Sequence, residues 1–226
     1  MNLLVCGYRD WAKEVIRNLS SNEKIKVFES INDHKKLLEK FSKPQKFDVI
    51  LFIGWSWIIP KNITDQYLCI GIHPSDLPDF RGGSPIQNQI INGITKSKVS
   101  LFTLASKIDS GEIWLKDDLS LQGDDMNSIF NKIIKSSTNL LNDFIERYPD
   151  IQSSTQNLTE GSYFKRRKPE QSKLTKNDLE KMSVKSIYNF IRCLTDPYPN
   201  AYFEDDKGDK VFFKEVSFIE KSKNNA

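Results

Sequence analysis

The stretch CIGIHPSDLPDFRGG, residues 69–83, decides how this chain is expected to fold. An uninterrupted apolar run, residues 68–72, leads up to His73 and contains Gly71. Continuous apolar sequence without alternation is typical of a strand buried on both faces of a parallel sheet. His73 then lies at the carboxyl end of that strand, which is the edge where open α/β sheets bind ligands. The alternative is a structural histidine that is hydrogen-bonded to a backbone carbonyl.

The segments before this strand predict the start of a Rossmann-like unit. Residues 3–6 and 47–53 are apolar and typical of buried strands, and the second is expected at the centre of the sheet. Residues 12–19 carry a helical apolar stripe with Asp10 as the expected N-cap. The turn between strand and helix reads GYRDW and lacks the glycines of a GxGxxG motif, so no dinucleotide cofactor is expected. His34, on a lysine-rich helix, is expected at the surface.

The segments after the opening stretch complete the predicted fold. Apolar periodicity predicts a helix, two strands and a long amphipathic helix over residues 84–92, 99–104, 113–115 and 125–148. We therefore predict an α/β fold with a Rossmann-like, open, mostly parallel sheet, helices on both faces and a small α+β C-terminal piece. Residues 152–160 are rich in Ser, Thr, Gln and Asn and indicate a linker. The predicted domains are residues 1–155 and a subdomain with a helix and a β-hairpin over residues 156–226.

Composition limits the partners and the location of the protein. Cys6, Cys69 and Cys193 are odd in number and widely spaced, which argues against a disulfide framework and against a metal site. The net charge of +3, from 33 basic and 30 acidic residues, gives no global field for nucleic acid. No apolar run approaches the roughly 20 residues of a membrane span, and the N-terminus lacks the features of a signal peptide. We therefore expect a cytoplasmic protein that binds neither nucleic acid nor membrane.

Two motifs carry a resemblance to a known family. The stretch HPSDLPDFRGGSPIQNQIINGITKSKVSLF, residues 73–102, is followed by KIDSGEI, residues 107–113. Together they resemble the formyltransferases that use N10-formyltetrahydrofolate, and the similarity extends over residues 1–115. The positions that match the family motif in order are His73, Ser75, Leu77, Pro78, Arg81, Gly82, Gly83, Asp109 and Gly111.

The resemblance implies a role for each of two titratable side chains. In formyl transfer an amine attacks the formyl carbon, the carbonyl oxygen gains negative charge and a proton leaves the amine. The resemblance implies that His73 assists this proton transfer and the oxyanion, and that Asp109 stabilises the imidazolium form and orients the ring. The alternative for Asp109 is a plain turn residue in an Asp-Ser-Gly sequence.

The resemblance also implies contacts to both substrates. The formyl donor, N10-formyltetrahydrofolate, is expected at Trp55, Ile58, Ile59, Leu77 and Asp109. Plain packing is the alternative for the apolar side chains among them. The acceptor is expected at Ser75, Arg81, Gly83 and Asn88.

One position departs from the family pattern. Gly71 stands where the family has a catalytic asparagine, and glycine offers no side-chain donor to the oxyanion. Loss of one such donor typically lowers the rate by about 10²- to 10³-fold. Either Ser75, Asn88 or a backbone N–H group replaces the missing donor, or the protein is a poor catalyst.

The nature of the acceptor is inferred from the whole chain. The stretches GYRDWA, GWSWIIP, HPSDLPDFRGGSPIQ, YFKRRKPEQS and TDPYPNAYF together look like the short formyltransferases that act on amino sugars. A transfer-RNA formyltransferase is expected to carry a longer, basic C-terminal domain. In that case we expect an acceptor phosphate to contact Lys165, Arg166 and Arg167. The alternative is that these residues form a solvated basic run.

We therefore expect formyl transfer to the primary amine of an amino sugar, nucleotide-linked or pseudaminic-type, in surface polysaccharide biosynthesis. One alternative is a folate or sugar binding protein with a decayed site. Another is a formyltransferase that acts on a different small amine or on methionyl-tRNA. The sequence leaves a homodimer open.

Overall fold

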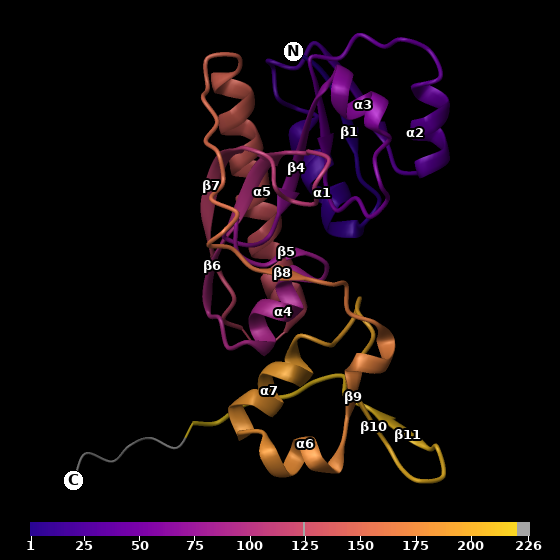
Figure 1. The fold of residues 1–226 in the computed structure, drawn as a ribbon, viewed down its shortest axis with the longest axis vertical. Coiled ribbons are helices and arrows are strands. Elements are labelled where there is room, and N and C mark those ends of the chain that lie inside the picture. Colours follow the sequence, from indigo (N-terminus) through magenta and orange to yellow (C-terminus); the bar gives the residue numbers. More distant parts are fainter. Residues whose placement is uncertain (124, 221–226) are drawn as a thin grey trace, which may run out of the picture.

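The computed structural model describes residues 1–123 and 125–220. Its main sheet has the strand order β2-β1-β3-β4-β6-β7 (Figure 1). In that order the strands span Val27–Ile31, Asn2–Cys6, Val49–Phe52, Leu68–His73, Lys96–Thr103 and Ile113–Ser120. The first four are parallel, and β6 runs antiparallel to β4 and to β7. The predicted Rossmann-like, mostly parallel sheet is confirmed.

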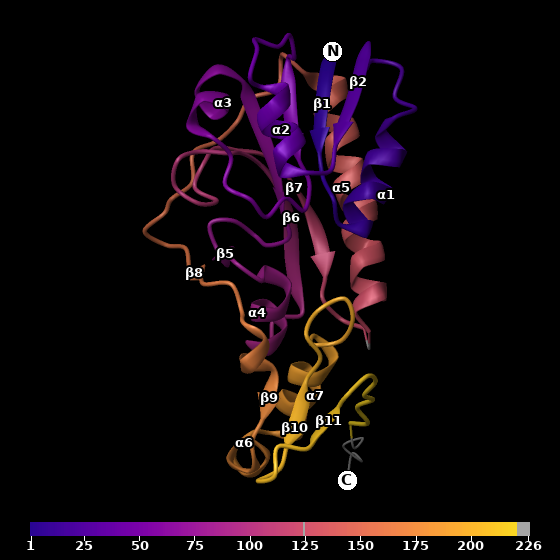
Figure 2. The same cartoon turned by 90° about the vertical axis from the view of Figure 1, so that its right-hand side faces the viewer.

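Helices cover both faces of this sheet (Figure 2). The helices α1, α5, α2 and α3 span Asp10–Leu19, Met126–Arg147, His34–Lys40 and Lys61–Gln66. Side chains of β1 alternate, so that Leu3 and Val5 pack toward α1 and α5 while Leu4 and Cys6 pack toward α2 and α3. Burying a Leu or Val side chain in this way stabilises the fold by about 1.5–3 kcal/mol.

The two longest predicted helices start at different kinds of cap. The Asp125 side chain accepts a hydrogen bond from the backbone N–H of Ser128 at 2.7 Å and begins α5 as predicted. The expectation that Asp10 caps α1 is wrong, because Arg9 is the N-cap and makes no side-chain capping bond. Asp10 lies in the first turn, where it pairs with Lys13 at 2.8 Å.

The chain after α5 returns along the main sheet before it forms the C-terminal piece. Ser154 bridges to Ile113 at the start of β7, and β8 (Tyr163–Phe164) pairs in parallel with β5 (Arg81–Gly82). Residues 152–160 are mostly exposed, but Ser154 and the buried Gln156 bond to the main domain, so the segment is not a free linker. This contact was not visible in the polar composition of the segment.

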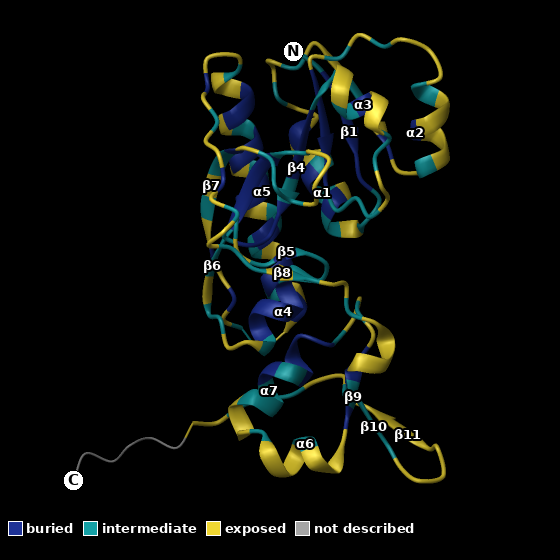
Figure 3. Cartoon of the chain, in the orientation of Figure 1, coloured by how far each residue is buried: buried dark blue, intermediate teal, exposed yellow. Residues whose placement is uncertain are grey.

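The small α+β piece lies beyond α4, the helix over Pro85–Ile91 (Figures 1 and 2). Its elements η1, β9, α6, α7, β10 and β11 span Pro169–Ser172, Lys173–Leu174, Lys176–Lys181, Val184–Arg192, Tyr202–Glu204 and Lys210–Phe212. Its sheet has the order β11-β10-β9, and α7 packs on α4, whereas α6 is mostly exposed (Figure 3). Residues 221–226 of the predicted subdomain lie outside the described part.

The three cysteine side chains are buried thiols. Cys6, Cys69 and Cys193 are free and buried. Burial raises the pKa of all three thiols, to about 12 for Cys69 and for Cys193, so they stay protonated near neutral pH.

Within residues 1–123 and 125–220, no helix combines the length and apolarity that a membrane span requires. In that part of the chain no group of three or more His, Cys, Asp or Glu is placed to hold a metal ion.

Candidate active site

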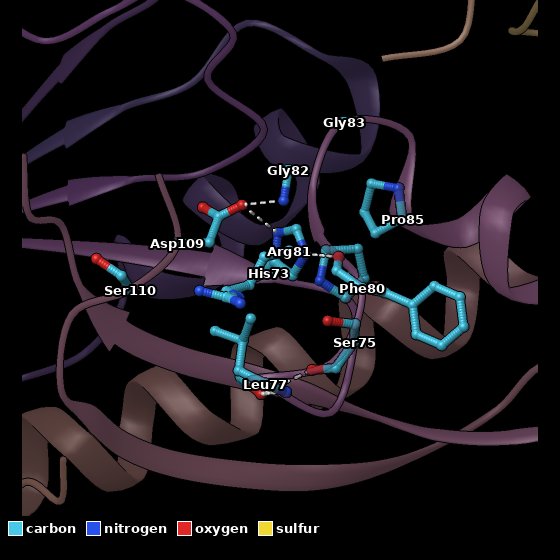
Figure 4. Close-up of polar contacts among 12 residues, drawn as sticks. His73, Ser75, Leu77, Phe80, Arg81, Gly82, Gly83, Pro85, Asp109 and Ser110 are labelled. Atoms are coloured by element: carbon cyan, nitrogen blue, oxygen red, sulfur yellow. Dashed lines mark hydrogen bonds and ion pairs between the residues drawn. The ribbon is translucent and has the colours of Figure 1, made fainter. Parts of the chain in front are cut away.

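The imidazole of His73 projects from the end of β4 toward the loop that follows it (Figure 4). Its Nε2 lies 2.8 Å from the carbonyl oxygen of Phe80. Because a carbonyl oxygen can only accept, Nε2 carries the proton of the neutral ring and Nδ1 is left with its lone pair. The ring also packs edge-on against Phe102, and its side chain is 8% exposed. One hydrogen bond and one ring contact therefore fix its orientation.

The carboxylate of Asp109 faces the other ring nitrogen. Its Oδ2 lies 3.6 Å from Nδ1 of His73 and accepts a hydrogen bond from the backbone N–H of Gly82 at 2.7 Å (Figure 4). A proton taken up at Nδ1 therefore creates an imidazolium beside a carboxylate that is only 14% exposed. The structure thus brings together the two residues that the sequence analysis paired.

Backbone strain is concentrated around this pair. Phe80, Ser84 and Asp109 have φ values of 54°, 52° and 50°, and in the described chain they are the non-glycine residues with positive φ. This left-handed conformation costs an L-residue roughly 1–2 kcal/mol. Phe80 accepts the bond from His73, and Ser84 and Asp109 line the same cavity as that histidine. Such clustering is typical of functional sites, where surrounding contacts hold a strained geometry.

A cavity of about 970 Å³ opens at His73 and Asp109. Part of its wall is apolar and comes from two loops, residues 54–60 after β3 and residues 104–109 after β6. The predicted donor-binding residues Trp55, Ile58 and Ile59 lie on this wall, although Ile58 is 91% exposed. The cavity volume matches that of pockets that enclose small molecules.

Two of the predicted site residues lie beneath the cavity. The hydroxyl of Ser75 donates to the carbonyl oxygen of Asp79 at 2.6 Å, and the carbonyl of Ser75 accepts from the Ser100 hydroxyl at 2.7 Å. Leu77 is fully buried and packs with Phe102. Neither side chain lines the cavity, so both hold the loop after β4 in shape.

Two further predicted residues also support this loop. The guanidinium of Arg81 is buried and donates to the carbonyl oxygens of Pro78 and Leu158 at 3.1 and 3.3 Å. The amide of Asn88 donates to the carbonyl of Gly83 at 2.9 Å. Of the predicted acceptor-binding residues, Gly83 lies on the cavity wall, whereas Arg81 and Asn88 lie behind it.

The strand β8 closes over the glycines of the same loop. The backbone N–H groups of Arg81 and Gly83 donate to the carbonyls of Ser162 and Phe164 at 3.0 and 2.8 Å. A Cβ atom on Gly82, whose φ is +94°, would lie 2.2 Å from the carbonyl oxygen of Phe164. Only glycine lets the two strands approach this closely while its N–H still reaches Asp109.

Gln156 holds the loop that carries Asp109. Its side-chain amide donates to the carbonyl oxygens of Asp109 and Gly111, at 3.1 and 2.6 Å. Gln156 is buried and comes from the segment whose composition indicated a linker. Two of the backbone carbonyls that shape this turn are therefore satisfied by one distant side chain, a contact with no local sequence signal.

The position of Gly71 is filled by its neighbours. Gly71 lies two residues before His73 and shares its face of β4, because side chains in a strand alternate. A Cβ atom there would lie 2.8 Å from Cδ2 of Leu104 and 3.0 Å from Cε1 of Phe102. Leu104 and Phe102 therefore occupy the space into which a side chain at position 71 would extend.

A basic part of the cavity wall was only partly foreseen. Arg9, Arg166 and Arg167 line it together with Tyr198. Arg166 and Arg167 belong to the basic run noted in the sequence. Arg9 and Tyr198 lie in the stretches GYRDWA and TDPYPNAYF, which were noted for the resemblance but not as binding residues. Arg9 follows β1 and Tyr198 lies in the TDPYPNAYF stretch, so only the tertiary fold brings them together.

Comparison with known proteins places this site in a family. The model of the family described as Formyl transferase matches residues 5–145. Methionyl-tRNA formyltransferase of Rickettsia prowazekii (strain Madrid E) is 31% identical over 207 residues, which cover 88% of this chain and 66% of that protein. The chain thus spans slightly less than two thirds of the length of this curated relative.

Solved structures agree with this match. A methionyl-tRNA formyltransferase from Clostridium thermocellum has a TM-score of 0.80 and 32% identity, and the alignment covers 97% of this chain and 94% of that chain. A 4-N formyltransferase from Francisella tularensis has a TM-score of 0.79, with 96% and 98% coverage, and at 20% identity it shows the fold alone. The chain belongs to the formyl transferase family.

Proposed function

We propose that the chain is an N-formyltransferase that moves a formyl group from N10-formyltetrahydrofolate to the primary amine of an amino sugar, a precursor of surface polysaccharide. The observation that carries this proposal is the position of His73 Nδ1, 3.6 Å from the Asp109 carboxylate, on the wall of a cavity of about 970 Å³. Membership of the formyl transferase family supports the reaction class.

The transfer forms one C–N bond and breaks another, and it needs a group that carries a proton between the two nitrogens. The acceptor amine gives up a proton as it bonds to the formyl carbon, and the departing N10 nitrogen takes one up. Nδ1 of His73 is the ring atom free for this proton, since Nε2–H is held by Phe80. Asp109 stabilises the imidazolium until the proton is passed on.

The donor fits the apolar part of the cavity. A flat heteroaromatic ring system packs well against Trp55, Ile59, Leu104 and Ile108, which line that part. Among the described residues no acceptor pairs with the indole N–H of Trp55, which is buried. Buried N–H groups usually have a hydrogen-bond acceptor, so this one is an exception in the wall of the proposed donor site. Ile58 and Asp109 complete the proposed donor site, with Leu77 beneath it.

The oxyanion is stabilised without the asparagine of the family. Ser75 and Asn88 were candidates to replace it, but both side chains already donate to backbone carbonyls. A backbone N–H group was the third candidate. The imidazolium of His73, which forms as the amine loses its proton, is the positive group beside the Asp109 carboxylate. We therefore assign oxyanion stabilisation to His73 itself, an electrostatic role that acts strongly in a site shielded from water.

A small acceptor is favoured over a macromolecule by the shape of the site. The reacting pair and the basic residues line one cavity of about 970 Å³, in the range of small-molecule pockets. The second candidate is methionyl-tRNA, because the relatives of highest identity described above are named for that acceptor. Chain length does not separate the two, since this chain covers 94% of a solved chain with the tRNA name.

Release of tetrahydrofolate tests the proposal. The purified protein is given the formyl donor with a panel of nucleotide-linked amino sugars, with small amines and with methionyl-tRNA in separate reactions. We expect turnover with an amino sugar. Turnover with methionyl-tRNA alone would transfer the assignment to the second candidate. Tight folate binding without turnover on any acceptor would identify a binding protein with a decayed site.

Gln156 offers a test of how Asp109 is positioned. Gln156→Leu removes the amide that serves two buried carbonyls, which costs about 1–3 kcal/mol in unfolding free energy. We expect kcat to fall, because the Asp109 carboxylate loses its fixed place beside His73. Gln156→Glu should be worse, since it sets a carboxylate against both carbonyls. The control is Gln152→Leu, an exposed position of the same segment, and equal kcat in both leucine variants contradicts the positioning role.

A further inference from the structure

One hydroxyl group in the cavity wall is surrounded by donors from separate parts of the chain. The Oγ atom of Ser56, in the loop after β3, accepts from Tyr8 Oη at 2.7 Å, from Arg166 Nη2 at 3.0 Å and from Arg9 Nη2 at 3.3 Å. Tyr8 and Arg9 follow β1, whereas Arg166 follows β8. Two guanidinium groups therefore meet at one neutral oxygen atom.

These guanidinium groups have no acidic partner. In residues 1–123 and 125–220, no carboxylate lies within ion-pair distance of Arg9, Arg166 or Arg167. Arg167 lines the same cavity. Its Nη2 donates to the carbonyl oxygen of Gln171, whereas its Nε is buried without a hydrogen-bond partner in that part of the chain. Like charges that converge without compensation repel one another. An anion placed among them relieves this repulsion and supplies the missing acceptors.

We propose that Arg9, Ser56, Arg166 and Arg167 form a subsite for the phosphate groups of the acceptor, and specifically for the diphosphate of a nucleotide-linked amino sugar. This inference rests on the proposed function and makes its acceptor more specific. The planar guanidinium groups suit phosphate, because each can donate two parallel hydrogen bonds to its oxygens. Ser56 adds a hydroxyl group at the same point, and Tyr8 holds this hydroxyl through a hydrogen bond.

The subsite is physically joined to the reacting pair. The backbone N–H of Arg167 donates to the hydroxyl of Ser84 at 3.1 Å, and Ser84 follows Gly83 on the cavity wall. The backbone N–H of Gly82, the residue before Gly83, donates a hydrogen bond to the Asp109 carboxylate. A diphosphate bound at the guanidinium groups therefore lies on the same continuous wall as His73, so the sugar amine has a path to the formyl group.

The arrangement favours a small anion over a nucleic acid. A nucleic acid backbone is bound by a stripe of cations that follows successive phosphates. Here the three guanidinium groups converge on one cavity, and Lys61, another cation on its wall, is already paired with Asp65 at 2.6 Å. The net charge of +3 adds no broad positive field. The structure thus points to a diphosphate held at one place.

Binding of inorganic pyrophosphate to the full chain tests the subsite without any turnover. We expect saturable binding by calorimetry, weakened about tenfold or more by Arg9→Gln and by Arg166→Gln, since each removes a charge-assisted contact. Arg166→Lys keeps the charge but loses the planar fork, so its affinity should lie between those of wild type and Arg166→Gln. Arg17→Gln is the matched control, because Arg17 is exposed on α1 and pairs with Glu14. The melting temperature of each variant confirms that it is folded.

Two nucleoside diphosphates, uridine and thymidine diphosphate, are then compared with transfer RNA. We expect the nucleotides to compete with pyrophosphate and to lose affinity in the same variants. Transfer RNA that competes while neither nucleotide binds overturns the small-molecule assignment. Pyrophosphate affinity that is absent, or equal in Arg166→Gln and Arg17→Gln, overturns the subsite. Because no formyl transfer is measured, these outcomes do not depend on whether the proposed reaction occurs.

Discussion

Replacing His73 with alanine is expected to lower kcat by at least about 10²-fold, the usual contribution of a general acid–base group. The Nδ1 atom is the proposed carrier of the amine proton, and its imidazolium form is the proposed partner of the oxyanion. Because Gly71 stands in place of an asparagine, no side chain at position 71 contributes to stabilising the oxyanion. The loss should therefore appear in kcat more than in the KM of either substrate.

Steady-state kinetics with a folding control checks this result. His73 makes one hydrogen bond and one ring contact, so its removal should leave the far-ultraviolet circular dichroism and the melting temperature close to those of wild type. Asp109→Asn keeps the shape but removes the charge beside Nδ1, and a smaller fall in kcat is expected. A His73→Ala enzyme with the wild-type kcat would falsify the assignment.

Replacing Gly111 with alanine is expected to destabilise the fold by about 3 kcal/mol or more, the upper range for overpacking. A Cβ atom at this position would lie 1.9 Å from the carbonyl oxygen of Thr103 and 2.8 Å from its carbonyl carbon. Both are backbone atoms, so no rotamer change relieves the clash. The turn must move away from β6, which also breaks the bond from Thr103 N–H to the carbonyl of Glu112 at 2.8 Å.

Thermal unfolding and kinetics measured together test this second prediction. For a chain of this size the expected fall in melting temperature is roughly 6–12 °C. Activity should fall further than stability explains, because Asp109 lies two residues away. Gly93→Ala is the matched control, since no atom lies within 4 Å of its Cβ position and only the strain of its φ of +77° is added. Equal losses in the two variants would show that steric contact with Thr103 does not decide the effect.

The sheet and its long helix were predictable because their signal is local. Continuous apolar runs predicted β3 and β4, and the apolar period over α5 predicted that helix almost to the residue. Short elements with few apolar residues, such as α3, β5 and β8, were missed. Their formation depends on pairing with distant parts of the chain, which no window of local sequence records.

The residues of the candidate site were also predicted only in part. His73 and Asp109 were paired through motifs of fixed spacing, and the structure places them in contact. Gln156 and Arg9 were missed as site residues. A buried amide contact and a guanidinium group without a carboxylate beside it leave no local pattern in the sequence. His34 was expected at the surface, but its ring stacks on Trp57 at 6.0 Å between centroids and its Nδ1 is buried. The loop that contains Trp55 and Trp57 was recognised in the sequence only as aromatic. Its packing against His34 depends on the tertiary fold, which explains why His34 is partly buried.

The pairing of β5 with β8 has a consequence for how the fold can be divided. A fragment that ends at residue 155, the boundary indicated by composition, keeps every strand of the main sheet. It loses the carbonyls that receive the N–H groups of Arg81 and Gly83, and it loses Gln156 as well. The reactive loop then has the correct residues without the partners that hold their geometry. We therefore expect the smallest autonomous catalytic unit of this chain to include these strand contacts and to extend past the Rossmann-like sheet.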